Sequence, residues 1–311
     1  MKSCSVALII IYNHQYNKNI DVIERIYKNS FSDIYHLVPF YNGEKENVIP
    51  VYENSFYFQG YVSQGLHSFF KEKYTHYFFI ADDLILNPGI NENNYDNIFN
   101  LGADTSFISR LSMLHERKSW WNRIGEAFQW STKVRGVEVS NMLPSYENAM
   151  DKFSKFGLTI KPFGFLHVCK LSFGLPFTVS IGLRKRFRFF CQYLMDKIRG
   201  KTFILSYPLA SSYSDIFIVS AKSIMEFCHY CGIFAVTKLF VEIAIPTSMI
   251  LSSDKITIEK DLDLQGKALW TKGDFQELEK YENSLTKLLS DFPIKYIYLH
   301  PVKLSKWKTE K

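Results

Sequence analysis

The chain has 311 residues, enough for one large α/β domain or two closely packed ones. Hydrophobic residues make up 47% of it and charged residues 22%, which excludes the weakly hydrophobic, highly charged class of disordered proteins. The formal net charge of +6 indicates an anionic partner, but it does not choose among a nucleotide phosphate, a nucleic acid and an acidic membrane surface.

The first hundred residues alternate apolar runs with amphipathic stretches, which is typical of βαβ units and a mainly parallel sheet. The first run is only as long as a strand and no cleavage site follows it, so we expect a strand rather than a signal peptide. The strands expected here are Ser5–Tyr12, Ile34–Phe40, Val48–Tyr52 and Tyr74–Ala81, and the helices are Ile20–Tyr27 and Phe56–Phe70.

Residues 100–207 show no regular period, and we assign them to acceptor binding because long connections in compact domains tend to be functional. The elements expected after them are a strand Asp215–Ser220, helices Ala221–Tyr230 and Phe234–Ile245, an amphipathic helix Gly273–Ser290 and a strand Ile294–Leu299. The most apolar later stretch is interrupted by Lys238, Glu242 and Pro246, so no membrane-spanning helix is expected. Five scattered cysteines without a second CxxC pair indicate free thiols in a reducing compartment.

Two adjacent carboxylates, Asp82 and Asp83, follow the most apolar strand of the first half. Like charges at the end of a buried strand repel unless a cation neutralises them, and a divalent metal would do so. Open α/β sheets also bind ligands at the carboxyl ends of their strands. The alternative is a solvated turn or a helix cap.

Phe78-Phe79-Ile80-Ala81-Asp82-Asp83-Leu84 resembles the DxD-type motif of the GT-A glycosyltransferases, with Ala81 at its first acidic position. The resemblance implies an α/β, Rossmann-like GT-A fold with a nucleotide-sugar-binding half at 1–100 and an acceptor-binding and catalytic half at 101–311. It also implies a Mn²⁺ or Mg²⁺ site, with Asp83 as direct ligand and Asp82 contacting the metal or the ribose.

The same resemblance implies that a late histidine returns to the metal, and Tyr298-Leu299-His300-Pro301-Val302-Lys303 supplies His300 as a third ligand with Lys303 near the diphosphate. Tyr12, Asn13 and His14 follow the first strand, where members of the family contact the base and ribose. A capped turn and an ordinary polar loop are the alternatives for these two segments.

Sugar transfer needs a base for the acceptor hydroxyl or a group that stabilises an oxocarbenium-like sugar. The candidates are Asp215, at the start of a strand, and Glu242, which stands among apolar residues and would be costly to bury without a partner. Trp120 and Trp121 are candidates for an aromatic platform under an acceptor sugar, or for a core anchor.

The function expected is therefore metal-dependent transfer of a sugar from a nucleotide-diphosphate sugar, first of all a UDP-sugar, to a saccharide or lipid-linked saccharide. Bacterial surface polysaccharide synthesis in the cytoplasm, at the inner face of the membrane, would suit such an enzyme. The cluster Arg184-Lys185-Arg186-Phe187-Arg188-Phe189-Phe190 interleaves cations with aromatic residues, as peripheral membrane segments do, although a solvated helix face would look the same.

Two other functions fit parts of the sequence. A nucleotidyltransferase would share the acidic metal site, but such enzymes usually carry a Gly-rich loop after the first strand, and Tyr12-Asn13-His14-Gln15-Tyr16-Asn17 has no glycine. A non-catalytic protein that binds nucleic acid or membrane would leave Asp82, Asp83 and His300 without purpose, and no nucleic-acid-binding motif accompanies the charge.

Overall fold

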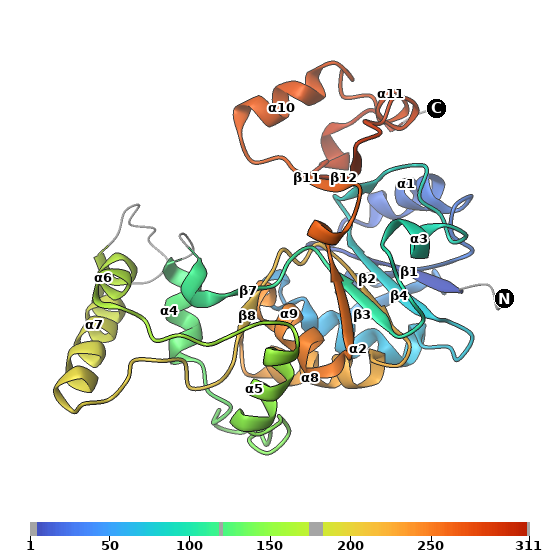
Figure 1. Cartoon of the computed structure of the whole chain (residues 1–311). Helices are drawn as coiled ribbons and strands as arrows, with labels where there is room; N and C mark the ends of the chain where they lie inside the picture. Colours follow the sequence, from blue (N-terminus) through green and yellow to red (C-terminus); the bar gives the residue numbers. More distant parts are fainter. Residues whose placement is uncertain (1–4, 118–120, 174–182, 310–311) are drawn as a thin grey trace.

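The computed structural model describes residues 5–117, 121–173 and 183–309, and the fold over these residues is mixed α/β (Figure 1). Within them, seven strands form a central sheet in the order β10-β6-β9-β4-β1-β2-β3. Neighbouring strands are parallel except at β9, which runs antiparallel to both β4 and β6. The strands are β1 (Val6–Ile11), β2 (Asp33–Pro39), β3 (Val48–Val51), β4 (His76–Ala81), β6 (Thr105–Ile108), β9 (Ile216–Ser220) and β10 (Lys255–Ile258).

The sheet is buried on both faces because its central strands are apolar throughout. In β1, alternate residues point to opposite faces: Leu8 and Ile10 join the core beneath α1 (Asn17–Tyr27). Ala7 and Ile9 join the core formed with α2 (Gln59–Phe69), α8 (Ile224–Val236) and α9 (Val241–Ser252). The elements expected in the first hundred residues are confirmed within a few residues at their ends. Three further elements there were not expected: the 3-10 helix η1 (Ser55–Tyr57), the short strand β5 (Ile85–Leu86) and α3 (Tyr95–Ile98).

The C-terminal part contains a second sheet of three strands among the described residues, in the order β11-β12-β5. Its strands are β11 (Gln265–Ala268), β12 (Tyr296–His300) and β5 (Ile85–Leu86). The strand expected near the C-terminus is therefore confirmed. Because β5 directly follows the turn after β4, its antiparallel pairing with β12 returns the C-terminal segment to the end of β4. In Figure 1 this orange and red segment lies above the central sheet.

The single helix expected at Gly273–Ser290 is wrong, because two helices occupy that stretch: α10 (Lys272–Glu279) and α11 (Leu285–Ser290). Between them, Glu282 and Asn283 adopt left-handed backbone conformations with φ of 52° and 53°, which prevent α10 and α11 from joining into one helix. The side chain of Ser284 then caps α11 by accepting a hydrogen bond from the backbone N–H of Lys287.

The helix expected at Phe234–Ile245 is also wrong. Two helices share this stretch instead: α8 continues to Val236, and α9 begins at Val241. Between them the chain turns at Lys238, which has a φ of 58°. The hydroxyl of Thr237 accepts a hydrogen bond from the Trp130 indole at 3.0 Å and so holds the turn. The break places the first turn of α9, with Glu242, at the candidate site described below.

The irregular middle of the sequence forms a helical extension with its own core. It contains α4 (Trp121–Gln129), α5 (Tyr146–Lys155), α6 (Phe165–Phe173), α7 (Leu183–Ile198) and the short strands β7 (Ser112–Met113) and β8 (Ala210–Ser211). Aromatic packing holds it together: the ring of Phe128 stacks on Phe203 at 4.7 Å and meets the edge of Phe163 at 4.5 Å. Figure 1 shows α4, α6 and α7 projecting away from the central sheet.

No helix in the described ranges is long and apolar enough to cross a membrane. The four cysteines that the structure describes, Cys169, Cys191, Cys228 and Cys231, are free thiols.

Candidate active site

A cavity of about 410 Å³ opens at the carboxyl ends of β1 and β4. From β1 the chain proceeds to β2 and β3 on one side, whereas β4 pairs on the other side, so the strand order reverses between β1 and β4. Open α/β sheets bind ligands at such a switch point. The lining residues are Asn13, His14, Tyr16, Asn19, Ser55, Phe56, Phe58, Asp82, Asp83, Asp215, Phe240, Val241, Glu242, Lys303, Leu304 and Ser305.

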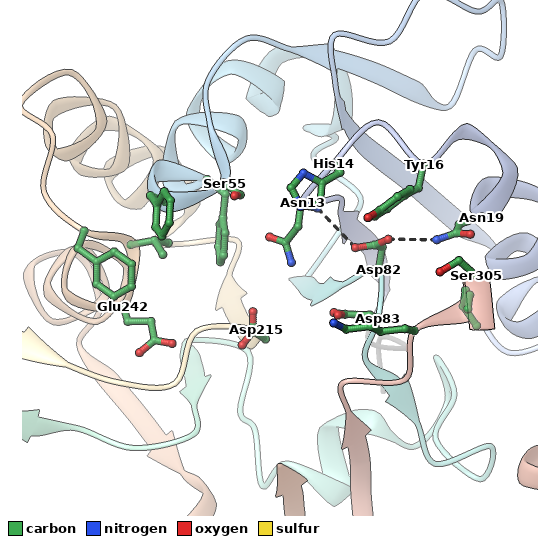
Figure 2. Close-up of a pocket in the computed structure, with 16 residues that line it drawn as sticks. Asn13, His14, Tyr16, Asn19, Ser55, Asp82, Asp83, Asp215, Glu242 and Ser305 are labelled. Atoms are coloured by element: carbon green, nitrogen blue, oxygen red, sulfur yellow. Dashed lines mark hydrogen bonds between the residues drawn. The ribbon is translucent and has the colours of Figure 1, made fainter. Parts of the chain in front are cut away.

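Asp82 lies at the β1 side of the cavity and is only 4% exposed. Its backbone N–H donates to the carbonyl of Ile11 at 2.9 Å, which fixes the turn after β4 against the end of β1. Its carboxylate accepts long hydrogen bonds from the backbone N–H of Asn13 (3.5 Å) and the side-chain amide of Asn19 (3.4 Å), as Figure 2 shows. Burial and then the neighbouring charge of Asp83 raise the pKa of Asp82 to about 7.

Asp83 faces the C-terminal segment. Its backbone carbonyl accepts a hydrogen bond from the N–H of Val302 at 2.7 Å, and its Oδ1 accepts one from His300 Nε2 at 2.9 Å. The other ring nitrogen of His300 is hydrogen-bonded to the hydroxyl of Tyr213 at 2.5 Å. Burial alone would lower the pKa of His300, but the hydrogen bond to Asp83 and the charge of Asp215 outweigh it and raise that pKa.

His300 therefore stands behind Asp83 rather than in the cavity wall. It is 6% exposed, and both of its ring nitrogens are already engaged. Lys303, three residues later, does line the cavity. Within the described ranges, no hydrogen bond or ion pair engages its ammonium group, which leaves the cation available to an anionic ligand.

Asp215 and Glu242 lie toward the other end of the cavity, away from Tyr16 and Asn19 (Figure 2). Asp215 directly precedes β9, and its carbonyl accepts a hydrogen bond from Ala81 N–H at 2.9 Å. Glu242 is in the first turn of α9, and its carbonyl accepts one from Ser212 N–H at 3.0 Å. Backbone hydrogen bonds thus join both residues to neighbouring strands and fix their positions.

The two carboxyl groups at this end hold their protons more tightly than free ones. Burial, followed by the charge of Asp215, raises the pKa of Glu242 to about 8, although Arg117 opposes the shift. Burial also raises the pKa of Asp215, although the positive charge of His300 opposes it. A carboxyl group with a pKa near the working pH suits proton transfer.

Among the residues expected to bind the donor, Asn13, His14, Asp82 and Lys303 come together in the cavity, whereas Tyr12 does not line it. Tyr12 is fully buried, and its hydroxyl is hydrogen-bonded to His36 Nδ1 at 3.0 Å. His36 in turn contacts Glu24 at 2.8 Å. Tyr12 thus anchors the start of the loop that carries Asn13 in the core, and does not face the cavity.

Of the two tryptophans expected to form the acceptor platform, Trp120 lies outside the described residues. Trp121 is the first residue of α4, and the position of its side chain is not described. The same helix reaches the cavity rim through Arg123. Its guanidinium lies 4.0 Å from the ring centroid of Phe240 and 4.9 Å from that of Phe56, both cavity residues.

Several cavity residues were not anticipated. Asn19 occupies the first turn of the helix that follows β1, and that position alone could have indicated it. Ser55 and Phe56 belong to η1, an element that was not expected. Phe240 precedes α9, whose first residue was placed too early in the sequence.

The oxygen-rich donor set suits a hard divalent cation. The carboxyl groups of Asp82, Asp83, Asp215 and Glu242 share one cavity, and the raised pKa values of three of them indicate mutual repulsion and burial that a cation would relieve. Across the described residues, no three His, Cys, Asp or Glu side chains form a preassembled metal centre. Magnesium-type sites often use one or two carboxylates with substrate phosphates and water, which fits this arrangement.

Comparison with known proteins adds no assignment: no protein-family model matches the sequence, and no curated protein is significantly similar to it.

Proposed function

We propose that the chain is a metal-dependent glycosyltransferase of the GT-A kind, which transfers a sugar from a nucleotide-diphosphate sugar to a saccharide acceptor. The observation that carries the proposal is the position of Asp82 and Asp83 after β4, beside the β1 loop and in one cavity with Lys303. The half-sheet order β3-β2-β1-β4 supports it, because nucleotide-binding Rossmann halves share the order 3-2-1-4.

The nucleoside would lie over the end of β1. Asn13, His14 and Asn19 offer amide and imidazole groups there, and the exposed ring of Tyr16 packs edge-on against His14 with centroids 5.4 Å apart. An aromatic pair of this kind can stack on a base. Asp82, held between two asparagines, is placed to accept hydrogen bonds from ribose hydroxyls.

The diphosphate would lie toward Asp83 and Lys303. Asp83, oriented by His300, is the residue best placed to hold Mn²⁺ or Mg²⁺ together with the diphosphate, and Lys303 adds a fixed positive charge. When bound, the metal would offset negative charge on the departing nucleoside diphosphate. Lys303 acts in the same direction, so the positive groups gather where the leaving group develops its charge.

The acceptor would enter at the opposite end, near Glu242 and Asp215. Glu242 is the candidate base for the acceptor hydroxyl, since a carboxylate with a pKa of about 8 is a stronger base than an ordinary glutamate. Asp215 lies closer to Asp83, where its charge would stabilise positive charge on the sugar. The aromatic rim formed by Phe56 and Phe240 would pack against the acceptor.

A donor panel tests this function directly. The chain is incubated with individual nucleotide-sugars and Mn²⁺ or Mg²⁺, and the released nucleoside diphosphate is measured with and without chelator. We expect metal-dependent release from one donor class, a UDP-sugar first, and its loss in Asp83→Asn. The matched control is Asp254→Asn, an exposed aspartate that forms an ion pair with the exposed Lys222.

The opposite result is equally clear. The proposal fails if no nucleotide-sugar releases a nucleoside diphosphate and if no added nucleoside diphosphate raises the melting temperature of the protein in the presence of Mn²⁺. If pyrophosphate is released from a nucleoside triphosphate instead, the same site belongs to a nucleotidyltransferase.

A further inference from the structure

The positive charge of the chain is concentrated in one stretch. Residues 161–201 contain nine lysines and arginines and one acidic residue, Asp196, so this stretch alone carries +8 whereas the whole chain carries +6. The stretch includes α6 and α7. The exposed cations that the structure describes on it are Lys161, Lys170, Arg184, Arg188, Lys197, Arg199 and Lys201.

The helix α7 is apolar on two opposite faces. Its inner face carries Phe189 and Tyr193, which are buried in the core of the helical extension. Its outer face carries Phe187, Leu194 and Ile198, which are 61%, 39% and 86% exposed. Their spacings of seven and four residues place them on one side of the helix, and we call these three residues the α7 stripe.

The neighbouring helix extends the apolar surface. In α6, Phe165, Leu166 and Phe173 are 53%, 75% and 47% exposed. Phe165 and Phe173 both contact Phe190 of α7, with ring centroids 6.4 and 5.1 Å apart, so the two helices form one unit. Soluble monomers rarely expose large contiguous apolar patches unless the patch binds a partner.

We propose that the helix pair α6 and α7 docks the protein on the surface of an anionic phospholipid bilayer. The α7 stripe and the exposed residues of α6 enter the boundary between headgroups and acyl chains, and the flanking arginines and lysines pair with lipid phosphates. The helix lies in the interface and does not span it: α7 has 16 residues and carries charge along its length.

Charge and side-chain chemistry favour this partner over two others. A second copy of the same face would carry the same excess of positive charge and would be repelled. A nucleic acid would attract the cations and could stack a base on Phe187, but it would leave the aliphatic Leu166, Leu194 and Ile198 without an apolar partner. An anionic bilayer accommodates both the cations and the aliphatic side chains.

If the proposed function holds, docking through α6 and α7 would bring the acceptor end of the cavity close to the membrane. Helix α6 packs against α4, and Arg123 of α4 stacks on the rim residues Phe56 and Phe240. The membrane-facing unit is thus joined to the acceptor end of the cavity, where a lipid-linked saccharide would arrive.

Vesicle co-sedimentation of the full chain tests the docking without any assay of activity. Vesicles of phosphatidylcholine alone are compared with vesicles that also contain phosphatidylglycerol, at low and high salt. We expect binding to the anionic vesicles that weakens with salt. Ile198→Gln should lower the partition coefficient about tenfold, since the isoleucine loses its apolar burial in the interface.

Two controls keep the test specific. Ile294→Gln alters an isoleucine of the same 86% exposure near β12 and should bind like the wild type. Arg188→Glu should also lower the partition coefficient at least about tenfold, whereas Lys272→Glu, a charge reversal of the same sign on α10, should have little effect.

Three results would overturn the proposal. The first is wild-type protein that stays in the supernatant with anionic vesicles at low salt. The second is equal loss of binding in Ile198→Gln and Ile294→Gln, which would show that the α7 stripe is not the contact. The third is concentration-dependent dimerisation that Ile198→Gln abolishes, without vesicle binding. All of these outcomes are independent of whether the chain transfers sugars, because the release of nucleoside diphosphate is measured in a separate assay without vesicles.

Discussion

His300 donates a hydrogen bond to Asp83 across 2.9 Å, although 217 positions of sequence separate the two residues. The antiparallel pairing of β12 with β5 brings them together, and the backbone hydrogen bond from Val302 to Asp83 fixes the distance. The C-terminal segment is therefore part of the site wall. It is also part of the core, since Val302 and Leu304 are almost fully buried. Deleting residues from 300 onward would remove part of this core and unfold the region, so point variants are the sharper test.

The first prediction concerns the orientation of Asp83. His300→Ala removes the imidazole that holds this carboxylate, and we expect the affinity for nucleoside diphosphate with Mn²⁺ to fall about tenfold. Titration calorimetry measures the affinity. Tyr213→Phe is the graded comparison, because it removes only the hydroxyl on the far side of His300 and should have a smaller effect. Unchanged Mn²⁺-dependent affinity in His300→Ala would remove this residue from the site.

The second prediction separates the two adjacent carboxylates. Asp83→Ala should abolish metal-dependent binding of nucleoside diphosphate, since Asp83 lines the cavity together with Lys303 and is hydrogen-bonded to His300 of the C-terminal segment. Asp82→Ala should weaken binding with and without metal, since Asp82 faces Asn13 and Asn19. Calorimetry with and without Mn²⁺ distinguishes the two. If Asp82→Ala proves to be the variant that loses only the metal-dependent part, the two roles are exchanged.

The sequence predicted the strands that position the site because those strands are apolar on both faces. β1 and β4 were located within two residues, and with them the loop at Asn13 and the pair Asp82-Asp83. The proximity of His300 and Glu242 to these strand ends depends on pairing and on helix breaks over long sequence separations, which local periodicity does not encode. The helical extension was not predicted because its aromatic residues pack into a core formed by loops and short helices. Its sequence therefore shows no hydrophobic periodicity that is long enough to indicate a helix.

The third prediction concerns stability and involves a histidine outside the cavity. His76 of β4 is buried, with Nδ1 hydrogen-bonded to the hydroxyl of Tyr95 at 2.8 Å and Nε2 to the carbonyls of Gly102 and Thr105. Burial lowers its pKa, although those carbonyls oppose the shift. The unfolded chain, with a histidine pKa of about 6.5, therefore binds the proton more readily than the folded one.

It follows that the stability contributed by His76 is present above about pH 6.5 and is lost as pH falls toward its folded-state pKa. Denaturant unfolding between pH 7 and 5 should show a decline of up to about 1.4 kcal/mol per pH unit from this group. His76→Gln should flatten the decline even though it lowers stability at pH 7. His67→Gln, which alters an exposed histidine of α2, should keep the wild-type slope. An unchanged slope in His76→Gln would contradict the prediction.

The last prediction assigns the base. Glu242→Gln keeps the shape of the side chain and removes its basicity, so turnover should fall by about 10²-fold or more while donor affinity stays near the wild-type value. Because the pKa of Glu242 is about 8 in the free protein, the fraction of its basic form increases as pH rises, and wild-type kcat/KM should rise up to about pH 8 and then level off. Asp215→Asn is the matched comparison, since Asp215 is the other carboxyl group at this end of the cavity but lies closer to Asp83. Removing its charge should lower the pKa of Glu242, because that charge is one of the two causes that raise it. The rise of kcat/KM should then shift to lower pH in Asp215→Asn, whatever activity remains. An inactive Asp215→Asn beside an active Glu242→Gln with the wild-type pH profile would make Asp215 the base instead.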